Sequence, residues 1–318
     1  PSSTNITVQE RATQLLNAES LPMNHAQAER SEPGWIDPRY LDGRAVQQRI
    51  VAAVRDELEQ LKATGGIGRL VSIAIGDIDA VTVYIRNQKR VAEKAGIPFE
   101  DQFWPGDLSQ EECKARITAM NDDPSILGII LQRPVPAHIN VRSLQSAIHP
   151  LKDVEGMNPA SIGNIVYNDL ALAPCTAAAS VELIRETGLE MKGLEVVMIG
   201  HSEIVGKPAA FMLMSEGATV TVCHHMTRSV AAHSRRADAV IVAVGIPGFL
   251  KPDMVKPGAA VVAAGVSFEG RKLLSDVADE VAEVADWLSP RIGGVGPMTR
   301  AMLLDNTVAA AELRVLGF

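Results

Sequence analysis

Residues 196–208 read VVMIGHSEIVGKP, an apolar run that passes through a glycine turn into the start of a helix. Gly200 permits a tight turn after the strand, and Gly206 lets the helix pack closely on that strand. Backbone N–H groups at the helix start, aided by the helix dipole, suit a pyrophosphate, to which Ser202 can donate its hydroxyl. Because Ser202 stands where the Gly-x-Gly-x-x-Gly fingerprint has its second glycine, an ordinary strand–helix turn remains the alternative.

Strands and helices alternate on both sides of this turn. In the C-terminal half, we expect helices over 177–186 and 204–215 and buried strands over 195–199, 219–223, 239–244 and 259–264. Four such strands with crossover connections predict a doubly wound, Rossmann-like half. In the N-terminal half, we expect helices over 44–63, 81–95 and 109–121 and strands over 70–75 and 126–131. With a last helix over 299–313, the fold class is α/β with parallel sheets.

The 318 residues suffice for about two domains. Lys and Arg number 30 and Asp and Glu 38, and the formal net charge of −8 argues against nucleic acid or an anionic membrane as a partner. The three cysteines have no metal-ligand spacing, so we expect no metal site and a reducing compartment. We see no secretory signal in residues 1–9, and apolar runs such as 239–250 are too short to span a membrane, so we expect a cytoplasmic protein. Residues 1–38 form a polar extension in which a short helix is expected over 8–16.

The second strand of the Rossmann-like half ends in Cys223-His224-His225, and Arg228 follows. An NAD-preferring fold usually places a carboxylate here to accept from the ribose 2′-hydroxyl. None is present, and neutral or cationic donors suit a 2′-phosphate. We therefore favour NADP as the cofactor, while NAD stays possible if these histidines are merely solvated.

Further motifs follow one another in order between residues 41 and 313. They are LDGR at 41–44, IGD at 75–77, LQRPVP at 131–136, HPLKDVEG at 149–156, PCT at 174–176, VAVGIP at 242–247 and GGVGPMT at 293–299. Together with the 200–208 turn, they resemble the bifunctional methylenetetrahydrofolate dehydrogenase/methenyltetrahydrofolate cyclohydrolase family, called FolD in bacteria. The resemblance covers all of the chain except the N-terminal extension.

The resemblance implies an N-terminal α/β catalytic domain plus a Rossmann-like NAD(P)-binding domain, with the C-terminal helix returning to the first domain. We expect the catalytic domain over 39–175 with the helix 299–318, and the cofactor domain over 176–298. Folate would lie in the cleft between the domains. A tetrahydrofolate-derived substrate and a homodimer formed through the cofactor domain are further implications.

The family reaction transfers hydride from 5,10-methylenetetrahydrofolate to the nicotinamide, and a second reaction adds water to the methenyl product. Tyr84 matches the family tyrosine, but the lysine expected four residues later is Gln88. Glutamine can hydrogen-bond, yet it cannot act as a general base, so we expect weak or absent cyclohydrolase activity. Lys89 is one helical step, about 100°, away, and could replace the lysine only through a local register change. Gln132 matches a catalytic family glutamine, and a structural role before Pro134 is the alternative.

Asp153 and Glu155 occupy the family's acidic motif, with Glu155 where an aspartate accepts from the pterin ring. Without the resemblance, Asp-x-Glu would more often be a solvated pair. The resemblance assigns Asp153 to catalysis and Glu155 to substrate binding, and it places Gly294 and Pro297 on the folate side. Arg133 replaces an apolar residue and could meet a glutamyl carboxylate or face solvent. These departures, with Arg291-Ile292 and Ala263, suggest a diverged member tied to a specialised one-carbon pathway.

The resemblance also assigns cofactor contacts to residues after each strand of the Rossmann-like half. They are Gly200, His201, Ser202, Val205, Gly206, His225, Arg228, Gly245, Ile246 and Val266. Three functions stay open: a dehydrogenase that has lost the cyclohydrolase step, the full bifunctional enzyme, and a silent folate- or nucleotide-binding homologue. The retained Tyr84, Gln132 and glycine turns argue against the third. An amino-acid or quinate-type dehydrogenase with a similar cofactor half is set aside, because it would need a Lys–Asp pair in the first domain that we do not find.

Overall fold

The computed structural model describes residues 39–63, 68–76, 79–270 and 272–316. The described chain forms two compact units. The first unit comprises Ile50–Ala173 and the chain from Leu303 onward, and the second comprises the chain up to Arg49 together with Pro174–Met302. By their contacts, residues 39–49 group with the second unit. The helix expected over 8–16 lies outside the described residues.

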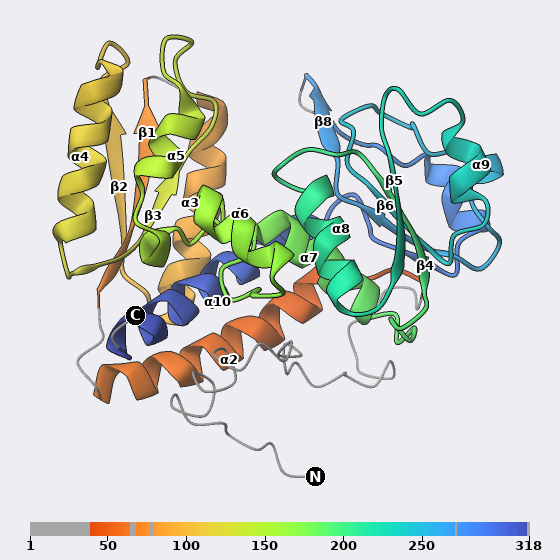
Figure 1. The fold of residues 1–318 in the computed structure, drawn as a ribbon, viewed down its shortest axis with the longest axis horizontal. Coiled ribbons are helices and arrows are strands. Elements are labelled where there is room, and N and C mark those ends of the chain that lie inside the picture. Colours follow the sequence, from red (N-terminus) through yellow and green to blue (C-terminus); the bar gives the residue numbers. More distant parts are fainter. Residues whose placement is uncertain (1–38, 64–67, 77–78, 271, 317–318) are drawn as a thin grey trace. The chain divides into compact units, whose positions relative to one another are not determined.

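The first unit is built on a parallel sheet in the order β2-β1-β3, formed by β1 (Arg69–Ile75), β2 (Phe99–Trp104) and β3 (Ile126–Leu131). Its helices are α3 (Asp79–Ala95), α4 (Gln110–Asp122), α5 (Val141–Ala147) and α6 (Pro159–Val166) (Figure 1). A single 3₁₀ turn, η1 (Pro150–Lys152), lies between α5 and α6 in the sequence. The sequence did not reveal β2, because its residues FEDQFW carry charges. The all-buried β3 lies at the predicted residues.

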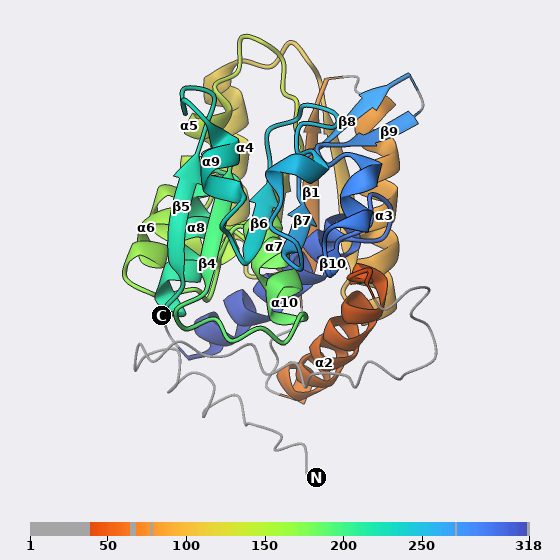
Figure 2. The same cartoon turned by 90° about the vertical axis from the view of Figure 1, so that its right-hand side faces the viewer.

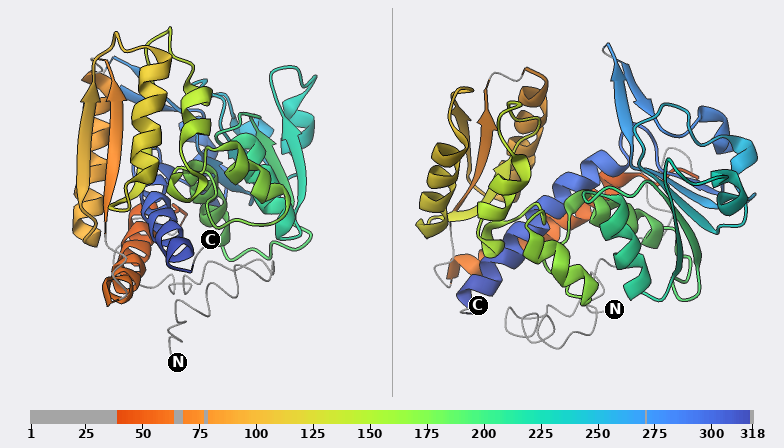
Figure 3. Two further views of the ribbon diagram at one scale, coloured as in Figure 1. Left: turned by 60° about the vertical axis from the view of Figure 1, so that its left-hand side comes forward. Right: turned by 45° about the horizontal axis from the view of Figure 1, so that its top comes forward.

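The second unit contains a parallel five-stranded sheet in the order β10-β7-β6-β4-β5 (Figure 2). Its strands are β4 (Glu195–Ile199), β5 (Thr219–Cys223), β6 (Ala239–Val242), β7 (Ala260–Ala263) and β10 (Trp287–Leu288). The helices are α7 (Cys175–Arg185), α8 (Gly206–Ser215) and α9 (Val230–Ser234), with 3₁₀ turns η2 (Pro252–Met254) and η3 (Asp279–Glu283). The expectation of four buried strands was wrong for β5, which is an edge strand with exposed side chains. An antiparallel hairpin of β8 (Val266–Glu269) and β9 (Lys272–Ser275), which we did not predict, extends from this unit (Figure 3).

Two helices of 21 residues, α2 (Gly43–Ala63) and α10 (Val295–Val315), are each divided between the units. Within the first unit, the amide of Asn306 on α10 donates to the carbonyls of Val154 at 3.0 Å and Ala173 at 2.9 Å. The guanidinium of Arg314 donates to Ile126 O at 2.8 Å and Leu127 O at 3.1 Å. The expected return of the C-terminal helix to the first domain is therefore confirmed.

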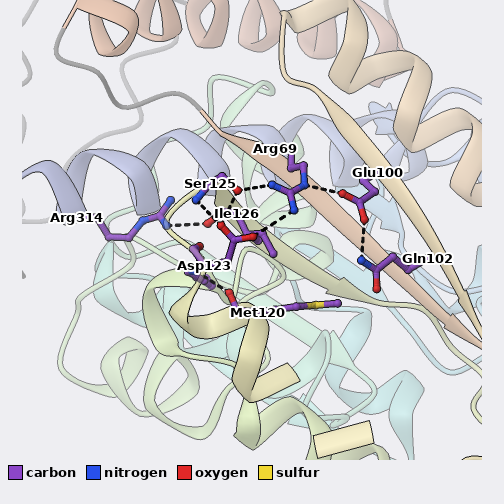
Figure 4. Close-up of polar contacts among 9 residues, drawn as sticks. Arg69, Glu100, Gln102, Met120, Asp123, Ser125, Ile126 and Arg314 are labelled. Carbon is purple, nitrogen blue, oxygen red and sulfur yellow. Dashed lines mark hydrogen bonds and ion pairs between the residues drawn. The ribbon is translucent and has the colours of Figure 1, made fainter. Parts of the chain in front are cut away.

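A polar network closes the amino end of β3 (Figure 4). Arg69 at the start of β1 binds the carboxylates of Glu100 at 2.6 Å and Asp123 at 3.3 Å. Lys152, although it lies in the motif HPLKDVEG, donates to Met120 O at 2.8 Å and Asp123 O at 2.6 Å. Its ammonium thereby holds the last carbonyls of α4, a structural role. Burial lowers the pKa of Lys152.

Across the described residues, no helix is both long enough and apolar enough to cross a membrane. Nor do the described histidine, cysteine, aspartate and glutamate side chains gather in threes with the geometry of a metal site.

Candidate functional site

The first unit holds a buried amide pair at the carboxyl end of its sheet. The Nε2 atom of Gln132 donates to Gln88 Oε1 at 2.8 Å and to Ser72 Oγ at 3.0 Å. Gln88 and Gln132 are 3% and 4% exposed. Ser72 pairs in register with Ile130, so the parallel strands bring the serine beside the residue that follows β3. The structure therefore joins the two predicted glutamines and adds Ser72, whose signal in the sequence was a lone hydroxyl within an apolar strand.

Helix α3 explains why Gln88 faces inward. The buried positions of this helix recur at helical spacing: Ile85, Gln88, Val91, Ala92 and Ala95. Tyr84, four residues before Gln88, is 40% exposed at the rim of the same face.

Lys89 lies on the neighbouring face of α3 and is engaged elsewhere. Its ammonium binds the Asp101 carboxylate on β2 at 2.8 Å, and this contact raises the pKa of Lys89. The helix runs without interruption from Asp79 to Ala95. A register change that would bring Lys89 into the amide pair is therefore absent from this structure.

The buried carboxylate of Asp153 organises its own loop. It accepts from the backbone N–H of Asn158 at 2.6 Å and from the hydroxyl of Ser161 at 2.8 Å. Burial raises the pKa of Asp153, and these hydrogen bonds oppose the shift. Its observed partners are thus those of a loop-forming residue, and the catalytic role stays a prediction.

Glu155 lies beside the outer edge of β3, next to Leu131, which is the residue that precedes Gln132. Its Oε2 atom accepts from the backbone N–H of Leu131 at 3.0 Å. Loss of hydration raises the pKa of Glu155 to about 7, although the charge of Arg133 and the Leu131 hydrogen bond act against it. Arg133 itself is exposed. A carboxyl group that changes charge near neutral pH therefore stands at the carboxyl end of β3.

We expect this carboxyl group to make the protein less stable as the pH rises. Since the folded pKa of about 7 exceeds the ordinary 4.5, the folded chain retains a proton that the unfolded chain releases between these values. The contribution to stability is complete below pH 4.5 and is lost as the pH approaches 7. In urea unfolding, the stability of Glu155→Gln relative to the wild type should increase by about 1–2 kcal/mol as the pH rises between these limits. This value is reduced because the Glu155 side chain is partly exposed. Parallel stability curves would contradict the assignment.

In the second unit, two glycines shape the turn between β4 and α8. Gly200 has φ +115°, and a Cβ there would lie 2.3 Å from the carbonyl oxygen of Ala243. A Cβ at Gly206 would lie 2.2 Å from the carbonyl oxygen of Gly200. The hydroxyl oxygen of Ser202 accepts from Val205 N–H at 3.2 Å, which leaves its proton available to a ligand. Helix α8 begins at Gly206 rather than at 204, because residues 203–205 form a turn.

Substituting Gly206→Ala should lower the free energy of unfolding by about 1–3 kcal/mol, because backbone atoms on the opposite side of the turn must move. Urea unfolding measures the change. Gly163→Ala is the matched control, since Gly163 lies in helix α6 with no atom within 4 Å of the added methyl group. It should leave stability unchanged or raise it by up to ~1 kcal/mol. Equal losses in the two variants would show that the turn is not tightly constrained.

The ends of β4 and β5 bring predicted cofactor residues together. His201 follows β4, and His225 and Arg228 follow β5; all three side chains are exposed. The imidazole centroids of His201 and His225 are 5.9 Å apart, and His224 lies close to both.

Asp276, which we did not predict, fixes two further loops of the second unit. Its fully buried carboxylate accepts from the backbone N–H groups of Val244 at 2.7 Å and Gly245 at 2.8 Å. A Cβ at Gly265 would lie 1.7 Å from the same carboxylate. Asp276 thus sets the loops that present the exposed Ile246 and Val266. No local pattern signals this role, because the fold alone brings Asp276 to residues some thirty positions earlier.

The glycine-rich loop before α10 packs on the start of α2 within the second unit. A Cβ at Gly43 would lie 2.0 Å from the carbonyl oxygen of Gly294, and Gln47 donates to the carbonyl of Pro297 at 2.9 Å. Gly294 and Pro297 are buried. Their contact with folate stays a prediction.

The turn between β4 and α8 fits a dinucleotide. Its backbone leaves no room for side chains at Gly200 and Gly206, so a pyrophosphate can approach the main chain. The loops after β6 and β7 lie at the same carboxyl edge of the sheet, where open α/β sheets bind their ligands.

Comparison with known proteins agrees with both units. The model of the tetrahydrofolate dehydrogenase/cyclohydrolase catalytic domain matches residues 41–155, and that of the NAD(P)-binding domain matches residues 174–315. The bifunctional protein FolD of Rhodobacter capsulatus is 65% identical over 285 residues, which cover 88% of this chain and 95% of that protein.

Two solved structures are also similar. The bifunctional FolD methylenetetrahydrofolate dehydrogenase/cyclohydrolase from Campylobacter jejuni has a TM-score of 0.82 and 37% identity, covering 86% of this chain and 99% of that chain. The methylenetetrahydrofolate dehydrogenase-cyclohydrolase of Trypanosoma brucei, complexed with NADP and an inhibitor, has a TM-score of 0.81 and 32% identity, covering 87% and 98%. This chain therefore belongs to the tetrahydrofolate dehydrogenase/cyclohydrolase family, with the catalytic domain followed by the NAD(P)-binding domain.

Proposed function

We propose that the protein oxidises 5,10-methylenetetrahydrofolate to 5,10-methenyltetrahydrofolate by hydride transfer, with NADP as the acceptor. The observation that carries the proposal is the buried Gln132–Gln88 pair beside Tyr84. The same chain has a turn between β4 and α8 whose backbone can receive a dinucleotide. Hydride loss leaves positive charge on a carbon between two nitrogens. Catalysis therefore needs alignment and charge stabilisation, without a metal ligand or a covalent nucleophile.

The residues of the first unit supply these needs. The amide of Gln132, held by Gln88 and Ser72, presents a fixed dipole at the carboxyl end of β3. Tyr84 offers a ring at the rim, against which the flat substrate can pack. Ionised Glu155 can accept from the amino and ring N–H groups of a pterin. Because burial disfavours that ionised form, substrate binding should release a proton near neutral pH.

The second unit would hold the cofactor by the residues already described. Gly200, Ser202 and Gly206 would receive the pyrophosphate, and Gly245, Ile246 and Val266 would flank the nicotinamide. When bound, the nicotinamide supplies the hydride-accepting carbon. The choice of NADP is supported by the absence of a carboxylate after β5 and by the NADP complex of the Trypanosoma brucei relative.

For the second reaction, we propose that cyclohydrolase activity is weak or lost. Gln88 cannot exchange a proton as lysine can, and Lys89 is bound to Asp101. Full bifunctionality is the second candidate, which the relatives' names favour, since the Rhodobacter capsulatus protein is called bifunctional.

One experiment separates these functions. Purified protein is given methylenetetrahydrofolate with NADP or NAD, and reduction of the nicotinamide is followed; hydrolysis of methenyltetrahydrofolate is then assayed separately. We expect reduction with NADP and slow hydrolysis. Comparable rates in both assays would establish the bifunctional enzyme. Failure to reduce either nicotinamide would favour a silent binding homologue.

We also propose that the enzyme acts as a cytoplasmic homodimer assembled through the second unit. Strand β5 is the outer strand of the described sheet, and apolar side chains are exposed on it and on α8, namely Val222, Phe211 and Met214. Such a patch beside a sheet edge suits self-association. Light scattering of the purified chain tests the assembly, and a monomer mass at assay concentration would refute it.

A further inference from the structure

Three of the seven histidines gather on two adjacent loops of the second unit. The ring centroid of His224 lies 4.7 Å from that of His201 and 5.8 Å from that of His225, while the outer pair is 5.9 Å apart. The strand register explains the cluster, because the parallel pairing of Ile199 with Cys223 places the residues after β4 beside those after β5. The imidazoles therefore lie at the carboxyl edge of the sheet, where a dinucleotide fold receives its adenosine ribose.

The central ring is fixed in place by its own loop. The backbone N–H of Met226 donates to His224 Nδ1 at 3.2 Å, and the N–H of His224 donates to Thr227 Oγ1 at 2.9 Å. These two contacts fix the ring of His224 in its loop. The ring of His201 stacks on it with an interplanar angle of 29°. His201 and His225 are exposed, so their rings can reach a bound ligand.

The charges around this cluster favour an anion. The other charged or titratable groups on its loops and on the flanking helices α8 and α9 are Glu203, Lys207, Glu216, Cys223, Arg228, His233, Arg235 and Arg236. Among them, Glu216 pairs with Arg185 and Arg235 with Asp253, while burial raises the pKa of the Cys223 thiol. The other side chains of this group contribute three positive charges, from Lys207, Arg228 and Arg236, and one negative charge, from Glu203. Of all these groups, imidazoles are the ones whose ordinary titration falls near neutral pH.

We propose that His201 and His225, aligned by His224, select the 2′-phosphate of NADP and take up one proton from solvent when that phosphate binds. The inference rests on the proposed cofactor and adds which side chains distinguish it from NAD. A phosphate dianion binds an imidazolium by charge-assisted hydrogen bonds, which a neutral ring cannot match. The 2′-hydroxyl of NAD provides no such gain. Preference for NADP over NAD therefore increases as the pH falls toward neutrality.

The test uses two fragments that differ only in the 2′-phosphate, 2′,5′-ADP and 5′-AMP, titrated calorimetrically into the full chain. Measurements run from about pH 7 to pH 8.5, above the second titration of the phosphate itself near pH 6. The Kd for 2′,5′-ADP should rise about tenfold over this range, within the limit of tenfold per pH unit for one linked proton. The Kd for 5′-AMP should stay constant. The difference in binding enthalpy between two buffers of different protonation enthalpy then gives the number of protons taken up on binding.

Asparagine variants locate the effect. His201→Asn and His225→Asn replace the titrating ring with a neutral amide that can still donate a hydrogen bond. Each should therefore weaken 2′,5′-ADP binding and flatten its pH dependence. His233→Asn on α9 is the matched control and should keep the wild-type dependence, with folding checked by circular dichroism. A pH-independent Kd in the wild type, or an unchanged slope in the double variant, would overturn the inference. If the double variant does not fold, the wild-type proton count decides. Nicotinamide reduction with methylenetetrahydrofolate reports separately on the proposed function, and the inference can fail while that activity stands.

Discussion

Gln88→Lys should raise the hydrolysis of methenyltetrahydrofolate by about 10²-fold, the lower range of what a positioned acid–base group contributes. The new ammonium would occupy the site where Gln88 now accepts from Gln132, 2.8 Å away. Dehydrogenase activity should change much less, because hydride transfer needs no proton at this position. Both activities are measured on the same preparation, and the ratio of hydrolysis to reduction is the decisive quantity.

Two further variants make that result specific. Gln88→Met keeps the length of the side chain but removes its hydrogen bond, so it should not raise hydrolysis. Lys89→Gln removes the ion pair with Asp101 on the next face of α3 and should leave the wild-type ratio in place. If folded Gln88→Lys hydrolyses no faster than the wild type, the face of α3 does not meet the substrate as proposed. A large loss of hydrolysis in Lys89→Gln would instead assign the proton transfer to Lys89.

Asp276→Ala should be among the most disruptive substitutions in the second unit, costing about 2–4 kcal/mol of unfolding free energy. It removes the buried acceptor of two backbone N–H groups, at Val244 and Gly245, and leaves both without a partner. The loops after β6 and β7 should then lose their fixed positions. We expect weaker NADP binding as well as lower stability, measured by calorimetry and by urea unfolding.

Asp276→Asn separates the two effects, because its amide oxygen can still accept from one or both N–H groups. It should retain more stability than Asp276→Ala while its NADP affinity lies between those of the wild type and the alanine variant. Asp253→Ala is a control on the surface of the same unit, where the carboxylate pairs with Arg235. Unchanged NADP affinity in Asp276→Ala would show that the carboxylate supports stability alone.

The local pattern of apolar and polar residues was sufficient to predict much of this fold, as three strands illustrate. β3, β4 and β5 occur at the predicted residues, because β-branched apolar runs end at polar or glycine positions. β2 escaped prediction, since its charged side chains bind partners such as Arg69 and Lys89 that lie elsewhere in the chain. Likewise, helical spacing placed Gln88 beside Tyr84, but only tertiary pairing could reveal Ser72 and Asp276.

The division of α2 and α10 between the units has a consequence for how the chain is made. Most of the first unit leaves the ribosome early, yet Asn306 and Arg314, which hold the carbonyls of Val154 and Ile126, are translated after the whole of the second unit. Until then, the carbonyl oxygens of Ile126 and Leu127 lack the Arg314 guanidinium that binds them in the finished fold, and an incompletely packed unit is prone to aggregate. The first unit is therefore completed only after the second has been synthesised.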